Sequence, residues 1–348
     1  MEQTPIAVVL TDTHLSEQNL DVNISLFKQT IEFCLDNDIK TIIHNGDVFH
    51  SRKAQPQILL TAFEQILDEV LVARIHMIVV TGNHDKTDYD SPKSFLSPFK
   101  HHPALTLIET YNIIKFGYTN VAFLSYFNDN VYNEHLKQLV DQIDSRDEYK
   151  DSEIMLFTHI GVAGARMNNG VAIESDVTPK QFKRFNTVKI GHYHDGQSFA
   201  NIHYIGASLQ HNFGERPNKG LQVLYNDHSM ELIQLESPQY IKYEIDVNSL
   251  TQKDLDDLRE EKENGDNFLR IVLVGQEQEV KAYNVQALKM IGVDVQMKVP
   301  DIDITELQST IEPFTNQSLI DQFGLFCEER ELDQEQGNQY FSKIVQNV

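Results

Sequence analysis

The stretch IAVVLTDTH at residues 6–14 decides the fold class of this chain. Its first five residues are apolar and predict a strand. Asp12 and His14 follow directly, where the strand ends. Because α/β proteins place their chemistry at the carboxyl ends of strands, both side chains are candidate functional residues.

The same arrangement recurs further along the chain. Apolar strands are expected at 41–44 and 76–80, and helices at 26–36 and 57–71. Short β-branched runs separated by amphipathic stretches predict parallel strand–helix–strand units. Polar segments again follow the strands: Gly46-Asp47, Gly82-Asn83-His84-Asp85, His159 and Gly191-His192-Tyr193-His194.

After residue 104 the pattern consists mostly of strands, which indicates a second sheet packed against the first. The predicted fold class is therefore α/β: a two-sheet sandwich flanked by helices, with a small C-terminal α+β capping domain and a helical tail. The later strands are expected at 106–109, 113–116, 121–125, 154–158, 187–191, 202–205, 220–225 and 230–234.

A domain boundary is expected at Ser237-Pro238, because proline interrupts strand pairing and the composition then turns acidic. We predict a catalytic domain at 1–237, an α+β domain at 238–300 and a tail at 301–348. Two apolar clusters in the tail have roughly helical spacing, so the tail is either ordinary core or a docking segment. The small domain should contain strands at 240–247, 267–274 and 292–299, and helices at 251–262 and 278–290.

Composition limits the classes of function. The 348 residues carry a net charge of −23, and residues 241–348 alone hold 22 acidic and 10 basic side chains. This charge argues against a general phosphate-binding surface, so any DNA contact must be local. The two cysteines are far apart and no apolar run could serve as a signal peptide or membrane span. We expect a soluble, cytoplasmic protein.

The ordered polar segments suit a two-metal phosphoesterase, a hydrolase that uses two divalent ions about 4 Å apart. Such a pair needs a shared carboxylate, and Asp47 is the candidate. Asp12 and His14 are alternate residues and can reach one ion together. This mixed oxygen and nitrogen set suits manganese, iron, zinc or magnesium. The remaining ligands would be Asn83, His159, His192 and His194.

His84 lies next to a candidate ligand, but we interpret it as an uncoordinated imidazole that donates a proton or a hydrogen bond to a phosphate oxygen. Asp85 would orient His84 or cap the following turn. The other histidines are predicted to have packing or surface roles: His44, His76, His101, His102, His135, His203, His211 and His228.

The motif order resembles that of the calcineurin-like metallophosphoesterase superfamily, D-x-H, G-D, G-N-H-D/E, H and G-H-x-H. Three details are similar to the SbcD family of double-strand-break repair nucleases. They are Asp47-Val48-Phe49-His50, the run from His159 to Ala165, and Tyr204-Ile205-Gly206-Ala207-Ser208 followed by Phe213-Gly214-Glu215.

The resemblance implies one metal held by Asp12, His14, Asp47 and His194, and another held by Asp47, Asn83, His159 and His192. It implies that His84 assists the transition state and that His50 positions DNA. The implied activity is a manganese-dependent DNA exonuclease and endonuclease of recombination, replication and repair. The implied partners are an SbcC-type coiled-coil ATPase and a second copy of the chain. The short chain is similar to phage-encoded members, which would act in the host cytoplasm.

Two alternatives remain open at this stage. The same scaffold also serves phosphoesterases that act on a nucleotide, a cyclic nucleotide or a phosphoprotein. A binding scaffold that has lost catalysis would lack ligands, and none is missing here. His50, the Tyr204–Ser208 run and the extra domain favour the nuclease.

Overall fold

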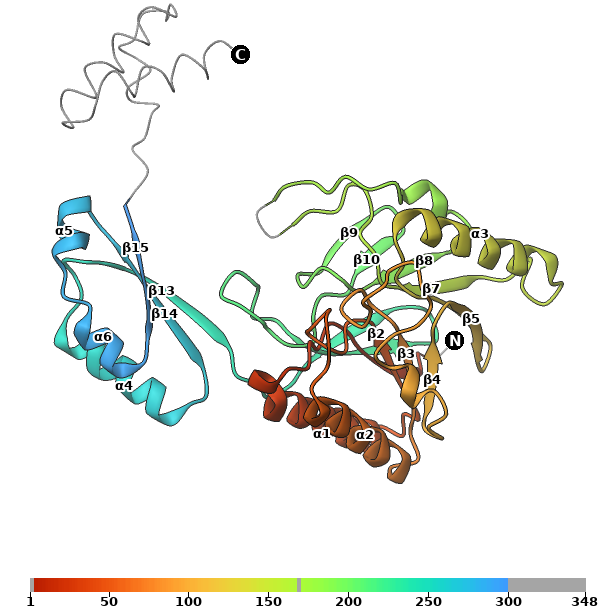
Figure 1. The fold of residues 1–348 in the computed structure, drawn as a ribbon, viewed down its shortest axis with the longest axis horizontal. Helices are drawn as coiled ribbons and strands as arrows, with labels where there is room; N and C mark the ends of the chain where they lie inside the picture. Colours follow the sequence, from red (N-terminus) through yellow and green to blue (C-terminus); the bar gives the residue numbers. More distant parts are fainter. Residues whose placement is uncertain (1–2, 168–169, 300–348) are drawn as a thin grey trace, which may run out of the picture. The chain divides into compact units, whose positions relative to one another are not determined.

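The structure is a computed structural model that describes residues 3–167 and 170–299 (Figure 1). Its main body contains two six-stranded sheets. In the first sheet β1 to β4 are parallel, and β11 and β12 extend it as antiparallel strands. The strand order is β12 (Met230–Gln234), β11 (Gly220–Tyr225), β1 (Pro5–Leu10), β2 (Thr41–Asn45), β3 (His76–Val80) and β4 (Leu105–Ile108).

The second sheet has a parallel centre, β6, β7, β8 and β10, with antiparallel strands at both edges. Its order is β5 (Tyr111–Phe116), β6 (Thr119–Leu124), β7 (Ile154–Thr158), β8 (Thr187–Ile190), β10 (Ile202–Tyr204) and β9 (Gln197–Phe199). The main helices are α1 (Leu20–Asp36), α2 (Gln57–Val72) and α3 (Asp129–Ser145). The short 3₁₀ helices are η1 (Glu17–Asn19), η2 (Ser97–Phe99) and η3 (Pro179–Phe182).

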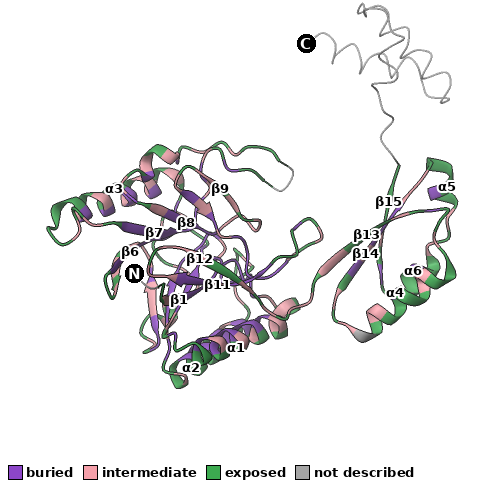
Figure 2. Cartoon of the chain, turned by 180° about the vertical axis from the view of Figure 1, so that it is seen from behind, coloured by how far each residue is buried: buried purple, intermediate pink, exposed green. Residues whose placement is uncertain are grey.

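Alternating residues of β1 show how the layers form. Val8 and Leu10 belong to the core beneath α1 and α2. Ala7 and Val9 face the opposite way, into a core shared with strands of the second sheet. Helix α3 covers the other face of that sheet. Successive side chains of a strand point to opposite faces, so β1 is buried on both sides. Figure 2 shows the buried strands between helices whose outer faces are exposed.

This four-layer arrangement confirms the predicted two-sheet sandwich flanked by helices. It also brings the carboxyl ends of β1, β2, β7 and β8 together. The amide of Asp12 donates to the carbonyl of Gly46 (3.0 Å), and the amide of Gly191 donates to the carbonyl of Thr158 (3.1 Å). The side-chain amide of Asn45 bridges the two sheets by donating to the carbonyl of Thr158 (3.0 Å). The loops that carry the candidate ligands therefore leave the two sheets at one place.

Two helices differ from the sequence prediction. Helix α1 begins at Leu20 rather than at residue 26, because Asn19 donates to the carbonyl of His14 and ties the start of the helix to the preceding loop. Helix α3 was not predicted. Only four of its residues are buried, and the polar remainder hides the apolar stripe.

A third sheet of three strands follows the main body, with the order β13 (Tyr240–Asp246), β14 (Phe268–Val274) and β15 (Asp294–Lys298). Helix α4 (Gln252–Asn264) agrees with the prediction. The helix expected at 278–290 is two helices, α5 (Glu277–Ala282) and α6 (Gln286–Ile291), because the side chain of Asn284 accepts from the amide of Gln286 at the break.

The boundary at Ser237-Pro238 stays a prediction, and the predicted tail at 301–348 lies outside the described residues. Within the described part of the chain, no helix combines the length and apolar character that a membrane span requires.

Candidate metal centre

All seven predicted ligands meet at the end of the sandwich where the two sheets join. Four clusters of described residues place candidate ligand atoms within 4.8 Å of one another, and Asp47 is a member of two; the remaining two are His14, His194 and His211, and His14, His50 and His84. The structure thus places this carboxylate where a bridging ligand belongs. One cluster with Asp47 is Asp12, His14 and Asp47; the other is Asp47, His159 and His192.

The backbone at this site is strained. Asp12, His14, Asp47 and His192 have φ angles of 51°, 46°, 55° and 86°, in the left-handed region that favours glycine. Each such residue costs of order 1–3 kcal/mol, and strain of this kind persists at functional sites because the surrounding structure enforces it. Four of the seven predicted ligands therefore occupy backbone positions that simple packing would not select.

Glycine is required beside the ligands. A Cβ on Gly46, which has a φ of 96°, would lie 2.2 Å from Nδ1 of His159. A Cβ on Gly82 would lie 2.2 Å from Oδ1 of Asp47. The glycine at position 46 therefore permits the close approach of the His159 imidazole.

His159 presents one ring nitrogen to the site. Its Nδ1 lies 2.9 Å from the carbonyl of Asn45, and because a carbonyl only accepts, Nδ1 carries the hydrogen. Its Nε2 is buried, lies 3.2 Å from Oδ2 of Asp47 and forms no aligned hydrogen bond. Burial opposes a charged imidazole, but Asp47 and Asp12 outweigh it and raise the pKa of His159 to about 9. The site thus attracts a cation.

The two buried aspartates respond differently to this setting. Burial alone would raise the pKa of Asp47, but His159 holds it well below its usual value. Burial dominates for Asp12 and raises its pKa. The carboxylate of Asp12 accepts from the hydroxyl of Thr11 (2.5 Å) and from the amide of His192 (3.0 Å). Asp47 is therefore the stronger candidate for a permanently charged ligand.

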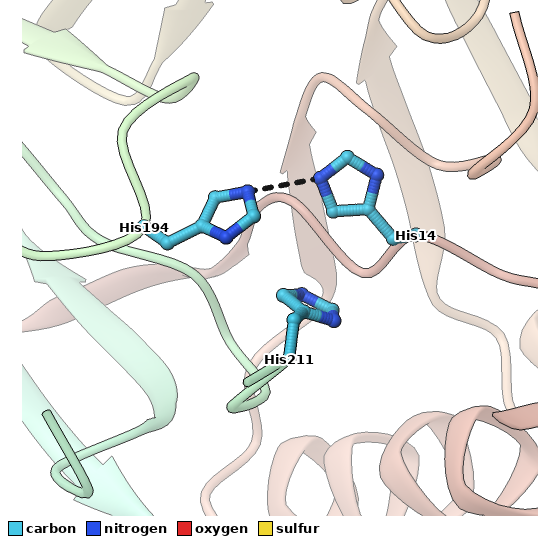
Figure 3. Close-up of side chains that lie close together, drawn as sticks. All are labelled: His14, His194 and His211. Carbon is cyan, nitrogen blue, oxygen red and sulfur yellow. Dashed lines mark hydrogen bonds between the residues drawn. The ribbon is translucent and has the colours of Figure 1, made fainter. Parts of the chain in front are cut away.

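His14 and His194 face each other across the site, with 3.0 Å between their Nε2 atoms (Figure 3). Nδ1 of His194 donates to Oε1 of Glu215 (2.8 Å), a carboxylate that is itself buried. This bond directs Nε2 of His194 toward the site, in the way that carboxylates orient metal-bound histidines. Glu215 was quoted in the sequence resemblance, but its role could not be read from its position.

His211 was assigned a packing or surface role, and the structure places it at the site instead. Its ring centroid lies 4.9 Å from those of both His14 and His194, and Figure 3 shows the three rings together. Its Nε2 lies 2.7 Å from the carbonyl of Asp12, so it holds the first loop in place. In the sequence, only its position four residues before Glu215, in a segment quoted for the resemblance, could have pointed to a place at the site. His44 is buried and packs against Phe27, as predicted.

His84 is half-buried beside the metal residues. Its Nδ1 donates to the carbonyl of His50 (2.5 Å), which leaves Nε2 as the acceptor nitrogen of the ring. Asp85 does not take the orienting role that we considered for it. It accepts from the amides of Gly82 (2.9 Å), three residues earlier, and Phe49 (3.0 Å), in the loop after β2, so it ties these two loops together and does not cap the following turn. Burial raises the pKa of Asp85 to about 7.

His50 is exposed at the edge of the same site. Its ring lies 5.5 Å from that of His14 and 5.8 Å from that of His84. A cleft of about 480 Å³ opens here, and its lining includes these three histidines. The cleft is therefore continuous with the metal residues.

The residues present fit a pair of divalent ions. Two buried carboxylates, an amide oxygen and four imidazoles form a donor set without sulfur, which excludes soft thiolate chemistry and suits hard or borderline ions. Asn83 completes the set, since its Oδ1 lies 2.9 Å from Nδ1 of His192. The buried, unpartnered Nε2 of His159 is the donor that an ion would satisfy.

A sandwich of two sheets with such a site at its end defines the class of dimetal phosphoesterases, which are hydrolases. The chain belongs to the calcineurin-like phosphoesterase family, whose model matches residues 7–196.

Two curated relatives are similar to this chain. The 244L protein of Invertebrate iridescent virus 6, whose name describes it as a phosphoesterase, is 28% identical over 242 residues, which are 68% of this chain and 80% of the viral protein. The DNA double-strand break repair protein Mre11 of Sulfurisphaera tokodaii is 28% identical over 207 residues, 55% of this chain. The chain spans about half the length of that archaeal protein, 49%.

Two solved structures resemble the chain distantly. A dimetal phosphatase from Danio rerio has a TM-score of 0.42 at 10% identity and covers 65% of this chain and 94% of its own. The calcineurin-like phosphoesterase YfkN from Bacillus subtilis has a TM-score of 0.37 at 12% identity. The match covers 67% of this chain and 89% of YfkN.

Proposed function

We propose that this protein is a metal-dependent DNA nuclease related to the SbcD family. It would act as an exonuclease on duplex ends and as an endonuclease on single strands or hairpins. Its role would be the processing of double-strand breaks in recombination, replication and repair. The proposal deepens the family assignment by naming DNA as the substrate.

The observation that carries the proposal is where the nuclease-like segments lie. The hydroxyl of Tyr204 donates to the carbonyl of Ile160 (3.1 Å) and accepts from the amide of Val162 (2.9 Å), which braces the loop after His159. The hydroxyl of Ser208 accepts from the amide of Thr11 (3.0 Å), beside the first ligands. Together with Glu215, these residues make the segments that resemble SbcD proteins part of the metal centre.

The similarity to Mre11 supports the same substrate. That relative is named for double-strand break repair, and its alignment with this chain covers 207 residues. Our proposal extends this role to the present chain, whose alignment covers 49% of the archaeal protein.

The chain's own residues suggest how they would act. When bound, two divalent ions in such a site polarise the phosphate and acidify a water molecule. Asp47 would hold both ions, and Glu215 would keep His194 in a binding orientation. His84 would take up a second proton from solvent at Nε2 and donate it to the leaving or a non-bridging oxygen, since the His50 carbonyl keeps the hydrogen on its other nitrogen. His50, at the rim of the cleft, would position the DNA.

The proposed cofactor is manganese, with magnesium, iron or zinc as alternatives. The proposed partners are DNA, an SbcC-type coiled-coil ATPase and a second copy of the chain. The region from residue 238 to 300 would cap the DNA and the tail would dock on the ATPase. A phage origin would place the protein in the host cytoplasm.

A small-substrate phosphoesterase is the second candidate, because the viral relative aligns over more of both chains than Mre11 does. Its substrate would be a nucleotide, a cyclic nucleotide or a phosphoprotein. The two candidates share the metal centre and differ in the substrate alone.

The test is a cleavage assay with the full chain, manganese and an end-labelled linear duplex, with and without chelator. A hairpin DNA and an aryl phosphodiester are assayed in parallel, and His84→Ala serves as the catalytic control. We expect metal-dependent cleavage of DNA that His84→Ala reduces at least a hundredfold. Hydrolysis of the aryl diester with no cleavage of any DNA, even after addition of the cognate ATPase, would favour the second candidate.

A further inference from the structure

Arg52 contacts the catalytic histidine in an unusual way. Its guanidinium nitrogen Nη2 lies 2.6 Å from Nε2 of His84. The other ring nitrogen of His84 carries its hydrogen toward the His50 carbonyl, so Nε2 is the acceptor and Arg52 is the donor. Arg52 therefore occupies the position at which His84 would meet a phosphate oxygen.

A neutral imidazole is a weak partner for an arginine. Guanidinium groups bind carboxylates and phosphates in preference, because these acceptors carry charge and match the planar fork of donors. The sequence contains 52 acidic residues, yet no described carboxylate forms an ion pair with Arg52. An arginine held at the active site without an acidic partner is available for an anionic ligand.

The loop that carries Arg52 does not depend on it. Arg52 lies between β2 and α2 and is exposed. Ser51 organises this turn, since its hydroxyl accepts from the amide of Lys53 (3.3 Å) and its carbonyl accepts from the side chain of Gln55 (2.5 Å). The guanidinium can therefore change partner without unfolding the turn.

The charge of Arg52 also reaches the metal residues. Its partner His84 lies beside them, with 4.5 Å between the ring centroids of His84 and His14. Arg52 thus lies close enough to act on a phosphate held between the metal ions and His84. Because the chain as a whole is acidic, an exposed cation at this position can offset the negative charge of a substrate.

We propose that Arg52 binds the phosphate that undergoes hydrolysis. In the free protein the guanidinium rests on Nε2 of His84; on substrate binding it moves to a non-bridging phosphate oxygen, and Nε2 is then free to take up a proton from solvent and donate it to the leaving oxygen. Arg52 is then a substrate-binding residue of the phosphodiester site. The inference rests on the proposed function for DNA, but the small diester substrate tests it separately.

The experiment compares Arg52→Met, Arg52→Lys and wild type, each loaded with manganese. Loss of one charge-assisted hydrogen bond predicts that Arg52→Met raises KM for the aryl phosphodiester about tenfold or more. The dissociation constant for inorganic phosphate, measured by calorimetry, should rise by a similar factor. Arg52→Lys should recover part of the loss, because it keeps the charge but not the fork. For DNA, the slope of log affinity against log salt should become shallower by about 1.

Lys115→Met is the matched control, since it also removes one exposed positive charge. Lys115 lies on β5 and pairs with Asn120, near the start of β6. This is the end of the strands opposite the metal site. The metal content and the midpoint of thermal unfolding show whether each variant is folded. If Arg52→Met does not fold, Arg52→Lys serves as the test.

KM and phosphate affinity of the Arg52 variants within twofold of Lys115→Met would overturn the inference. If no DNA is cleaved but the diester and phosphate effects appear, the role of Arg52 stands and the nuclease proposal fails. If DNA is cleaved and Arg52→Met matches the control, the nuclease proposal stands and the role of Arg52 fails.

Discussion

At the scale of the residue, the metal centre depends on side chains that hold its ligands in place. Glu215 is the clearest case, because its buried carboxylate takes the Nδ1 hydrogen of His194 at 2.8 Å. Burial opposes ionisation of Glu215, but the hydrogen bond from His194 outweighs burial and lowers the pKa of Glu215. Without the carboxylate the imidazole could rotate or change tautomer.

We expect Glu215→Ala to weaken manganese binding at the position of His14 and His194 about 10–100-fold. Glu215→Gln, which keeps an acceptor oxygen, should lose less. Calorimetric titration of the metal-free protein with manganese measures both, with the exposed Glu231→Ala as the control. Two ions bound by Glu215→Ala with wild-type affinity would show that His194 needs no orienting carboxylate.

His44 provides a prediction about pH. Burial lowers its pKa to about 3, and its Nε2 lies 3.0 Å from the hydroxyl of Thr13. Because the folded pKa is below the unfolded value of about 6.5, the unfolded state binds the proton first as the pH falls. The neutral His44 therefore supports the fold above pH 6.5, and this contribution is lost progressively as the pH falls toward 3.

Urea unfolding in chelator at pH 7.5 and pH 5.0 tests this. Wild type should lose about 2 kcal/mol more than His44→Gln between the two pH values, from the linkage of a single group. An equal loss in both proteins would mean that His44 is not buried in its neutral form.

The convergence of the seven candidate ligands could be predicted from sequence, because each follows closely on an apolar strand. Arg52, His211 and the function of Glu215 could not. They come from loops without regular periodicity, and only the folded chain shows which side chains those loops bring to the site.

At the scale of the element, strand ends determine the site. Asn45 ends β2, and its side-chain amide donates to carbonyls of two strands in the other sheet, Thr158 (3.0 Å) and Lys189 (3.3 Å). Its own carbonyl accepts from His159. One residue thus links the sheets beside the metal centre.

Asn45→Ala should lower the free energy of unfolding by about 2 kcal/mol, because two buried hydrogen bonds are lost. Chemical denaturation of the metal-free protein measures this, and the exposed Asn218→Ala is the control. A change below about 0.5 kcal/mol would indicate that the sheets are held by apolar packing alone.

Most strands were predictable, because buried strands read as short apolar runs between breaker residues. The elements that were missed or misplaced are those whose pattern is weak. Helix α3 buries only Tyr132, Leu136, Leu139 and Ile143, and β9 has three residues. The break between α5 and α6 depends on a hydrogen bond from Asn284, which periodicity does not reveal.

At the scale of the whole molecule, the net charge of −23 opposes a polyanionic substrate. The described residues that line the cleft include no lysine or arginine, so the bound ions would supply much of the attraction for phosphate. We therefore expect DNA affinity to depend on metal, on the ATPase partner, or on both.

Fluorescence anisotropy with a labelled duplex tests the metal dependence, with His84→Ala used to prevent cleavage. In chelator at 150 mM salt the dissociation constant should exceed about 10 µM, the range of weak non-specific binding. Manganese should lower this dissociation constant at least tenfold. Submicromolar binding without metal would show that protein side chains alone attract the DNA.

The central claim is a pair of ions bridged by Asp47, and the most direct measurement is anomalous diffraction from crystals soaked in manganese. We predict two anomalous peaks about 4 Å apart, one on either side of the Asp47 carboxylate. A single peak, or two peaks of which one has no contact with Asp47, would contradict the account.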